Sequence, residues 1–366
     1  MTEIGIGIVG GGYMGKAHSA AMASVGTVFE TARKPRLEMI CATSEESAEG
    51  YRAAFGFARA TADWRALVAD PRVEAVVIAS PQATHREIAL ACLEAGKPVM
   101  CEKPMGASLE DARAMVAAAA ASGCANMVAY NYIRTPASQY ARRLIADGAL
   151  GRITWVRAEH VEDFHNDTDV AAWRYQGRAN GCIGDLAPHI YNAALALIGP
   201  IESLNAVIET VHPERGGVPV TNDDQVQMMV RFEGGAMGHL FSSRVATGRK
   251  MGYAYEIFGT RGAIRFDQED QNALWFYDAA DPPEQRGFRK ILAGPAHPDY
   301  LAFCKGPGHG TGYQDQIIIE AKDFLCAIET GEAVWPTFRD GLEVRRVIEA
   351  AFASDESNSW VSLSDF

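Results

Sequence analysis

The sequence lacks several patterns that mark whole classes of protein. None of its seven cysteines forms a C-x-x-C pair, and their odd number and wide spacing argue against a disulfide framework or a zinc site. No uninterrupted apolar run of about 18 residues is present, so no membrane-spanning helix is expected. No basic, cleavable leader opens the sequence, which together with the cysteines favours a reducing cytoplasm.

Clusters of positive charge are also missing. The net charge is −12, and no run of Lys and Arg is long enough to follow a phosphate backbone. Nucleic acid and anionic membrane surfaces are therefore excluded as expected partners. The 366 residues suffice for about two domains, and 48% hydrophobic with 22% charged residues is a globular composition, neither disordered nor fibrous.

Up to about residue 132, short β-rich apolar runs alternate with helical patterns. This alternation predicts a doubly wound parallel sheet with crossover helices, a Rossmann domain over residues 1–132. One helix should end at Gly56, and another should begin after the capping sequence at Ser108 and end at Gly123. The expected strands are residues 4–9, 37–42, 75–79, 99–101 and 126–130.

Beyond residue 132 the pattern changes, and strands follow one another across short Gly or Asp turns. We expect a second, α+β domain over residues 133–366 with a large, mostly antiparallel open sheet. Its expected strands are 153–160, 226–232, 236–242, 253–258, 263–266 and 274–277. Helices are expected at 137–146, 185–198, 314–329 and 341–353, with a Gly/Pro-rich loop at 281–312.

A glycine-rich turn follows the first strand. Gly10-Gly11-Gly12-Tyr13-Met14-Gly15 fits G-x-G-x-x-G between a buried strand and a helix, which is the dinucleotide fingerprint. Gly10 allows the tight turn, Gly12 lets the backbone approach a pyrophosphate, and Gly15 lets helix and strand pack closely. A purely structural glycine turn is the alternative. The position at the first strand of a Rossmann pattern favours the nucleotide.

The residue that contacts the adenosine ribose is harder to assign. Counting from the fingerprint selects Glu30, but Glu30 precedes Arg33-Lys34-Pro35 in a loop before the second strand. The functional position should instead be the end of that strand, where Ser44 could serve a ribose or a 2′-phosphate. The flanking Glu45 and Glu46 would repel a 2′-phosphate and Arg33 would attract it, so NAD and NADP both stay open.

Two further patterns carry polar chemistry. Glu102-Lys103-Pro104 lies just after an expected strand, at the carboxyl edge where open α/β sheets bind ligands. In the second half, Asp185, His189 and Asn192 stand at i, i+4 and i+7, which would place them on one face of one helix. A neutral His beside a carboxylate can receive the proton of a hydroxyl that loses hydride. The alternatives are a surface Lys, an Asp that caps the helix, and a core His.

Together these motifs resemble the glucose-fructose oxidoreductase / inositol dehydrogenase / rhizopine catabolism protein family over essentially the whole chain. Further segments support the resemblance: Thr84-His85-Arg86, Ala95-Gly96-Lys97-Pro98, Ala129-Tyr130-Asn131-Tyr132, Gly148-Ala149-Leu150-Gly151-Arg152-Ile153 and Phe258-Gly259-Thr260-Arg261-Gly262. Others are similar to its bacterial levoglucosan dehydrogenase branch: Met14-Gly15-Lys16-Ala17-His18, Arg134-Thr135-Pro136, Gly294-Pro295-Ala296-His297-Pro298 and Ile318-Ile319-Glu320-Ala321.

The resemblance implies an NAD(P)-dependent dehydrogenase of sugars or cyclitols that needs no metal. It implies an open sheet with the active site on one face and an oligomer interface on the other, hence a homodimer or homotetramer. Lys103, Asp185 and His189 match the family's catalytic residues. Asn192 departs from the Asp often found there, which puts substrate orientation in doubt.

The resemblance also implies two sets of binding residues. Those expected near the cofactor, besides the glycine turn, are Tyr13, Met14, Ser44, Ser80, Pro81, His85, Glu102, Lys103, Asn131, Trp173, Arg174 and Tyr313. Those expected near the substrate, besides Lys103, Asp185 and His189, are Tyr132, Asp163, His165 and Arg174.

Two other functions stay open at this point. The fold also hosts regulators that bind the nucleotide without turning it over, although such a sensor has no need of a proton acceptor like His189. Some relatives transfer hydride to imines or dihydrodiols instead, but a His-Asp pair suits an alcohol better.

Overall fold

The computed structural model describes residues 2–169 and 173–366, and its packing divides the chain into two units. The first unit is Met1–Arg134 with Gly312–Glu343, and the second is Thr135–Thr311 with Val344–Phe366. The sequence assigned the segment 312–343 to the second domain. It lies in the first unit because its helix α10 (Tyr313–Thr330) packs along α1 (Tyr13–Val28).

The first unit contains a six-stranded, fully parallel sheet in the order β3-β2-β1-β4-β5-β6. This is the strand order of a dinucleotide-binding fold, with the order reversing beside β1. The fold class expected from the sequence is confirmed. The strands are β1 (Thr2–Val9), β2 (Arg33–Cys41), β3 (Arg59–Thr61), β4 (Ala75–Ile78), β5 (Val99–Glu102) and β6 (Asn126–Ala129).

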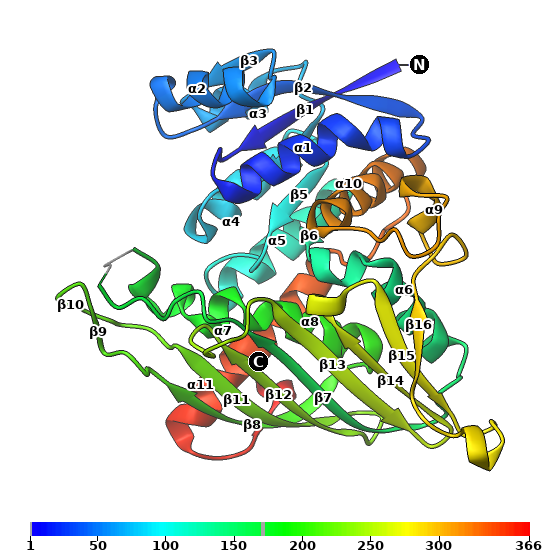
Figure 1. The fold of residues 1–366 in the computed structure, drawn as a ribbon. Helices are drawn as coiled ribbons and strands as arrows, with labels where there is room; N and C mark the ends of the chain where they lie inside the picture. The colour runs from blue at the N-terminus through cyan, green and yellow to red at the C-terminus, as the bar shows by residue number, and fades with distance from the viewer. Residues whose placement is uncertain (1, 170–172) are drawn as a thin grey trace. The chain divides into compact units, whose positions relative to one another are not determined.

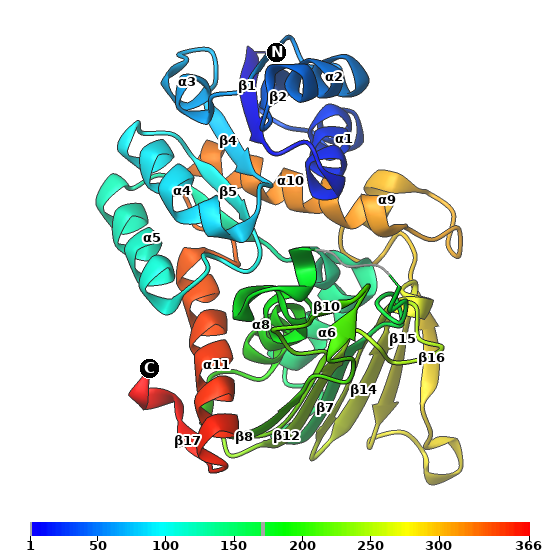
Figure 2. The same ribbon diagram turned by 90° about the vertical axis from the view of Figure 1, so that its left-hand side faces the viewer.

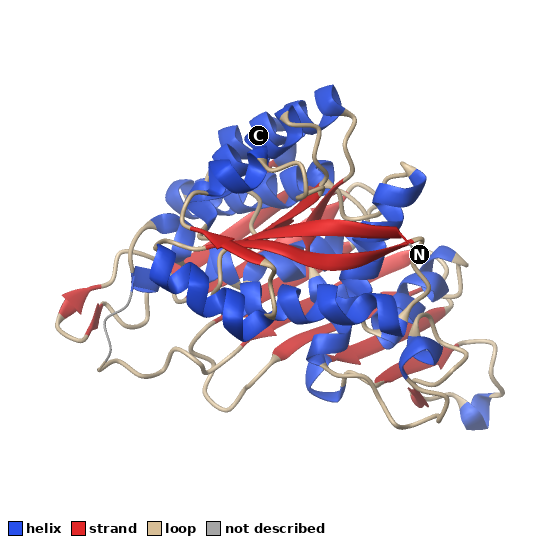
Figure 3. Cartoon of the chain, turned by 90° about the horizontal axis from the view of Figure 1, so that it is seen from above, coloured by secondary structure: helices blue, strands red, loops and turns tan. Residues whose placement is uncertain are grey.

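Helices cover both faces of this sheet (Figures 2 and 3). In Figure 2, α1 and α2 lie to one side of it, and α3, α4 and α5 lie to the other. The sequence missed β3 and α3 because each is too short to show a periodicity. Besides α1 and α10, the helices are α2 (Glu45–Phe55), α3 (Trp64–Ala69), α4 (His85–Glu94) and α5 (Leu109–Ser122).

The second unit is built on a nine-stranded sheet in the order β16-β15-β14-β13-β7-β12-β11-β8-β17. Only the pairing of β7 with β12 is parallel, and the other neighbours are antiparallel. The strands are β7 (Ile153–Val161), β8 (Ile201–Glu209), β11 (Gln225–Phe232), β12 (Met237–Ser243), β13 (Gly252–Gly259), β14 (Gly262–Asp267), β15 (Ala273–Asp278), β16 (Arg289–Leu292) and β17 (Val361–Ser362). A separate hairpin joins β9 (Glu214–Arg215) and β10 (Val218–Pro219).

Helices pack on one face of the nine-stranded sheet, where the core of the second unit lies (Figure 1). Along β11, buried residues alternate with partly or fully exposed ones, as expected for a sheet covered on one face only. The sequence missed β8 and the edge strands β16 and β17, and it placed β16 and α9 in a loop. The helices are α6 (Pro136–Ala146), α7 (Cys182–Asp185), α8 (Ala187–Leu197), α9 (Tyr300–Phe303) and α11 (Phe338–Ser357), which starts in the first unit.

In the part of the chain that the structure describes, no helix has the length and apolar character needed to cross a membrane.

Candidate functional site

The glycine turn after β1 has the geometry that the fingerprint requires. Gly10 adopts a φ of 104°, a region that residues with side chains rarely enter. A Cβ on Gly10 would collide with the backbone of Ala79, and one on Gly15 would collide with the carbonyl of Gly10. A Cβ on Gly12 would meet no atom within 4 Å. The turn is thus closed where strand and helix pack and open where a pyrophosphate would approach, so it fits a dinucleotide.

The start of α1 is suited to an anion. Its N-cap, Gly12, has no side chain to satisfy the first N–H groups, and the first turn holds no acidic residue. These N–H groups and the helix dipole therefore remain available to a phosphate.

Aromatic side chains gather beside this turn. Tyr13 is 71% exposed and stacks on Tyr313, with ring centroids 6.3 Å apart. Tyr132 lies 6.2 Å from the same Tyr313 ring, and the Tyr313 hydroxyl contacts the Met14 sulfur at 3.6 Å. The structure thus brings together Tyr13, Met14, Tyr132 and Tyr313, which the sequence placed at the cofactor and substrate. Tyr313 returns to the first unit on α10.

The segment after β2 gives less support to a ribose contact. The Ser44 hydroxyl accepts a hydrogen bond from the Ser47 N–H at 3.1 Å and so caps α2. Arg33 cannot serve a 2′-phosphate, because it begins β2 at the far end of the strand, where it pairs with Glu74. That end lies roughly 25 Å of extended chain from Cys41. Glu30 lies in the loop before β2, as expected.

The loops after β4 and β5 are tied together by His85. Its Nε2 lies 2.8 Å from the carbonyl oxygen of Ser80, and its Nδ1 lies 3.2 Å from that of Pro104. Burial lowers the pKa of His85, so the ring is neutral and its one N–H donates to Ser80. Ser80 also shares a 2.7 Å hydroxyl contact with Thr84. His85 is therefore a buried support for the segment that contains Pro81.

Glu102 and Lys103 are held by a buried histidine that the sequence did not single out as functional. The His18 Nε2 lies 2.7 Å from Glu102 Oε1, and the Lys103 backbone N–H donates to Glu102 Oε2 at 3.1 Å. Burial lowers the pKa of His18, but the hydrogen bond and charge of Glu102 outweigh it, and the net pKa is raised. Lys103 is partly exposed at the carboxyl end of β5, as expected.

A second carboxyl, that of Glu320 on α10, belongs to the same buried cluster. Glu320 is 0% exposed, and neither of its oxygens has a hydrogen-bond partner. Burial raises the pKa of Glu320 to about 8, against the opposing charges of His18 and Arg134. Glu320 is therefore protonated at neutral pH. The sequence marked Glu320 only as a carboxylate within the apolar run 317–321 and as part of the resembling segment Ile318-Ile319-Glu320-Ala321.

Asn131 lies at the start of a 3-10 helix (Asn131–Arg134) in the first unit. Its side-chain amide donates to the Gln316 oxygen on α10 at 3.1 Å, and it is 3% exposed. The hydrogen bond fixes Asn131 against the helix that also carries Tyr313 and Glu320.

In the second unit, the helix expected at 185–198 is divided. Asp185 ends α7, Leu186 is the single intervening residue, and His189 lies in the first turn of α8. The division arises at Pro188, which has no N–H to continue the helical ladder. Asp185 is therefore the last residue of α7, and the N-cap position of α8 is held by Leu186. His189 and Asn192 are 5% and 1% exposed.

The start of α7 is fixed by a residue that the sequence did not identify. Asp223 precedes β11, and its side chain accepts from the Ile183 N–H at 2.8 Å while its carbonyl accepts from Cys182 at 3.0 Å. It replaces the cap that Gly181 cannot supply, and a Cβ on Gly181 would collide with it.

Asp163 and His165 have partners of their own within the second unit. Asp163 forms a 2.7 Å ion pair with Lys250, and this hydrogen bond lowers its pKa. The His165 Nδ1 lies 2.9 Å from the Tyr175 hydroxyl. Burial, followed by the charge of Arg244, lowers the pKa of His165 to about 4, so the ring is neutral at ordinary pH.

Arg174 is exposed in a 3-10 helix (Trp173–Tyr175), where its carbonyl accepts from Asn222 at 2.8 Å. The side chain of Trp173 lies outside what the structure describes.

A buried charge cluster supports this region. Arg215 and Arg244 both pair with Asp224, at 3.2 Å and 2.8 Å, and all three side chains are almost fully buried. Arg244 also donates to Asn222 Oδ1 at 2.7 Å, and both guanidinium groups lie over the Tyr175 ring. No sequence motif marks the cluster, because its members come from separate strands and loops.

The chain matches two family models. Residues 4–130 match the oxidoreductase family with an NAD-binding Rossmann fold, and residues 138–265 match the GFO/IDH/MocA C-terminal domain. Among characterised proteins, the chain is 38% identical to levoglucosan dehydrogenase of Pseudarthrobacter phenanthrenivorans over 99% of both chains.

Solved structures show the same likeness. A levoglucosan dehydrogenase in complex with NADH and levoglucosan superposes with a TM-score of 0.96 at 38% identity, covering 99% of this chain and 100% of that one. An inositol dehydrogenase homolog from Azotobacter vinelandii, complexed with NADH and myo-inositol, has a TM-score of 0.84 at 25% identity, with 99% and 98% covered. The chain belongs to the GFO/IDH/MocA family of NAD-binding oxidoreductases.

Proposed function

We propose that this protein is an NAD-dependent dehydrogenase that oxidises one secondary hydroxyl of a sugar, an anhydrosugar such as levoglucosan, or a cyclitol. The observation that carries the proposal is full-length likeness to a levoglucosan dehydrogenase, together with Lys103, Asp185 and His189 in this chain. Levoglucosan and myo-inositol are the first substrates to examine, because relatives were solved with them.

The first unit supplies the nucleotide site in this proposal. The N–H groups at the start of α1 bind the pyrophosphate, and Gly12 leaves room for it. Nicotinamide supplies the acceptor for the hydride when it is bound. The residues that we propose around the cofactor are Tyr13, Met14, Ser44, Ser80, Pro81, His85, Glu102, Asn131, Trp173, Arg174 and Tyr313.

In the proposed mechanism His189 is the general base. It takes the hydroxyl proton while the carbon loses hydride, and Asp185 stabilises the imidazolium that forms. Lys103 donates a hydrogen bond to the reacting oxygen and offsets the negative charge that develops there. Tyr132, Asp163, His165 and Arg174 are the proposed contacts to other hydroxyls of the substrate.

Turnover separates this function from its alternatives. The purified protein is incubated with NAD or NADP and a panel of sugars, anhydrosugars, cyclitols and dihydrodiols, and absorbance of the reduced nicotinamide is followed. We expect turnover of at least one sugar or cyclitol. Cofactor binding without turnover of any compound would support a sensor, and turnover of dihydrodiols alone would support that other enzyme class.

We also propose a homo-oligomer, either a dimer or a tetramer, formed through the outer face of the nine-stranded sheet. Helices α6, α7 and α8 pack on the other face of this sheet (Figure 1). Four large apolar side chains are exposed on the outer face: Trp155 (39%), Val207 (62%), Met229 (51%) and Met237 (54%). Trp155 and Met237 are direct neighbours on the paired strands β7 and β12. An apolar row of this kind on a sheet surface is typical of a protein interface.

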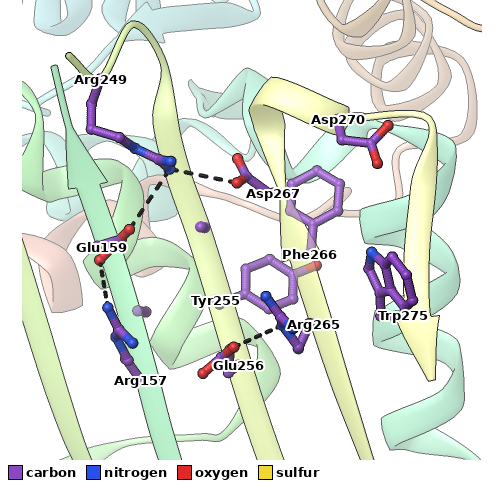
Figure 4. A pocket seen from close by; sticks show the side chains of 12 residues that line it. Arg157, Glu159, Arg249, Tyr255, Glu256, Arg265, Phe266, Asp267, Asp270 and Trp275 are labelled. Atoms are coloured by element: carbon purple, nitrogen blue, oxygen red, sulfur yellow. Dashed lines mark hydrogen bonds and ion pairs between the residues drawn. The ribbon is translucent and has the colours of Figure 1, made fainter. Parts of the chain in front are cut away.

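Charged side chains continue the outer face around a cavity of about 300 Å³ (Figure 4). Arg265 pairs with Glu256 at 2.7 Å, and Arg249 reaches Asp267 at 3.5 Å.

Light scattering tests the oligomer and should return a molecular mass that is a multiple of 39.5 kDa. The double variant Trp155→Asp, Met237→Asp should lower this mass. A monomer at micromolar concentration would contradict the proposal.

We infer a reducing compartment such as the cytoplasm. All seven cysteines are free thiols, as that location would require. Cell fractionation with an antibody tests the location.

A further inference from the structure

A second histidine, not used in the mechanism above, lies beside the proposed base. His160 is near the end of β7 and is 1% exposed. Its ring centroid lies 5.4 Å from that of His189, with the rings inclined at 66°. His160 Nδ1 is 3.0 Å from the carbonyl oxygen of Leu186, and Nε2 is 3.1 Å from Glu162 Oε1.

The contact with Leu186 fixes the place of one ring hydrogen of His160. A backbone carbonyl can only accept a hydrogen bond, so Nδ1 must carry a hydrogen to bond Leu186. The 3.1 Å contact between Nε2 and Glu162 holds the opposite edge of the ring.

His160 is connected to His189 through the junction of two helices. Leu186 is the single residue between α7 and α8, and its carbonyl also accepts the His189 N–H at 3.2 Å. Pro188 provides no N–H to stiffen this junction. The hydrogen bond from His160 therefore fixes the Leu186 carbonyl, to which the backbone N–H of His189 also donates.

We propose that His160 and Glu162 form a positioning pair, in which Glu162 holds the ring of His160 and the Nδ1–H of His160 fixes the Leu186 carbonyl and through it the ring of His189. The proposal rests on the proposed role of His189 as general base. Glu162 is itself fixed, because its N–H donates to Ser243 and its carbonyl accepts from Ala246, both at 2.8 Å. Displacing a catalytic group by about 1 Å can cost about a hundredfold in rate.

Three substitutions of His160 separate its two bonds. The amide nitrogen of Asn occupies the place of Nδ1, so His160→Asn keeps a donor for Leu186. The longer Gln places its amide near Nε2, so His160→Gln keeps a donor for Glu162 only. His160→Phe keeps the ring and loses both. Tyr255→Phe is the matched control, because it removes a buried 3.0 Å hydrogen bond to Ser138 on the same face of the sheet.

We expect His160→Phe and His160→Gln to lower kcat at least tenfold. His160→Asn and Tyr255→Phe should stay within threefold of the parent, and every variant should bind NADH within threefold. A merely structural role would reduce both amide variants alike. Equal losses in His160→Asn and His160→Gln, or a kcat within threefold in a folded His160→Phe, would overturn the proposal.

Nitrogen-15 NMR of labelled histidine, recorded with NADH bound, tests the bond to Leu186 without turnover. One imidazole should show a hydrogen on Nδ1, and its signal should be lost in His160→Asn. A His160 whose Nδ1 carries no hydrogen in the parent would overturn the proposal. Absence of turnover in the parent would overturn the proposed function instead, and the NMR result would still decide whether the bond to Leu186 exists.

Discussion

In the first unit, helices begin and end at residues that a sequence pattern identifies, whereas in the second unit the sheet depends on pairings between distant strands. Ser44 and Gly56 bound α2, and Ser108 and Gly123 bound α5, where the capping patterns placed them. In the second unit, β7 lies between β12 and β13, each of which follows it by more than 70 residues in the chain. Local signals therefore specify helix ends, and they leave strand order open.

The two units also bury charge differently. The buried cluster of the first unit consists of groups that can gain or lose a proton, namely His18, Glu102 and Glu320. In the second unit, the buried cluster consists of two arginines, Arg215 and Arg244, paired with Asp224. The first arrangement responds to pH because the pKa values of His18 and Glu320 are raised there. The second does not, because arginine keeps its charge at every ordinary pH. This difference can be tested by separate measurements.

The largest expected effect is on catalysis. Replacing His189 by Ala should lower kcat about 10²–10⁴-fold, the usual cost of losing a general base. The NADH dissociation constant should change less than threefold, because the glycine turn of the first unit provides most of that binding. Lys103→Ala should behave similarly. A folded His189→Ala that keeps kcat within threefold would exclude this base.

The next effect concerns the buried ions of the second unit. Asp224→Asn leaves two buried guanidinium groups without their carboxylate and should lower the free energy of unfolding by about 3–5 kcal/mol. Denaturant titration measures it. Asp147→Asn removes an exposed partner of Arg143 and should change stability by less than about 1 kcal/mol. Similar losses in both variants would contradict the assignment.

A smaller effect is expected in the first unit, where Glu320 should make the free energy of unfolding depend on pH. Glu320 has a pKa of about 8 when folded and an ordinary one near 4.5 when unfolded. The folded state thus binds the proton more tightly, and stability falls as pH rises from about 4.5 to 8. Glu320→Gln should match the parent near pH 4.5 and exceed it by roughly 2–4 kcal/mol at pH 8.5.

Thermal or chemical unfolding at several pH values measures the Glu320 effect. Asp224→Asn supplies the comparison, since it should lower stability by a similar amount at pH 6 and pH 8.5. A Glu320→Gln variant whose stability relative to the parent does not change with pH would show that the carboxyl is ionised in the folded protein.

The smallest effect is on cofactor choice. NAD should be preferred modestly, because Glu45 and Glu46 follow Ser44 and disfavour a 2′-phosphate, and Arg33 lies at the other end of β2. The ratio of kcat/KM for NAD and NADP measures it. A hundredfold preference for NADP, about 2.7 kcal/mol, would contradict this expectation.

Patterns of neighbouring residues allowed the glycine turn, the Glu102-Lys103 edge and most helices to be predicted. The sequence could not place α10 beside α1, because nothing in residues 314–329 indicates which unit buries that helix. The prediction of a single helix at 185–198 did not take into account that Pro188 interrupts the helical hydrogen bonds. Buried partners such as Glu320 and Glu162 stayed hidden, because a polar residue acquires that role only from distant segments that surround it.

The return of residues 312–343 to the first unit has a consequence for synthesis in the cell. Residues 1–134 leave the ribosome early with all six strands of the parallel sheet, yet α1 lacks the helix that packs along it. Helix α10, which covers this surface of α1, is translated later, after every strand of the nine-stranded sheet except β17. The unit that is translated first is thus completed late, and premature termination before residue 313 would leave both units defective.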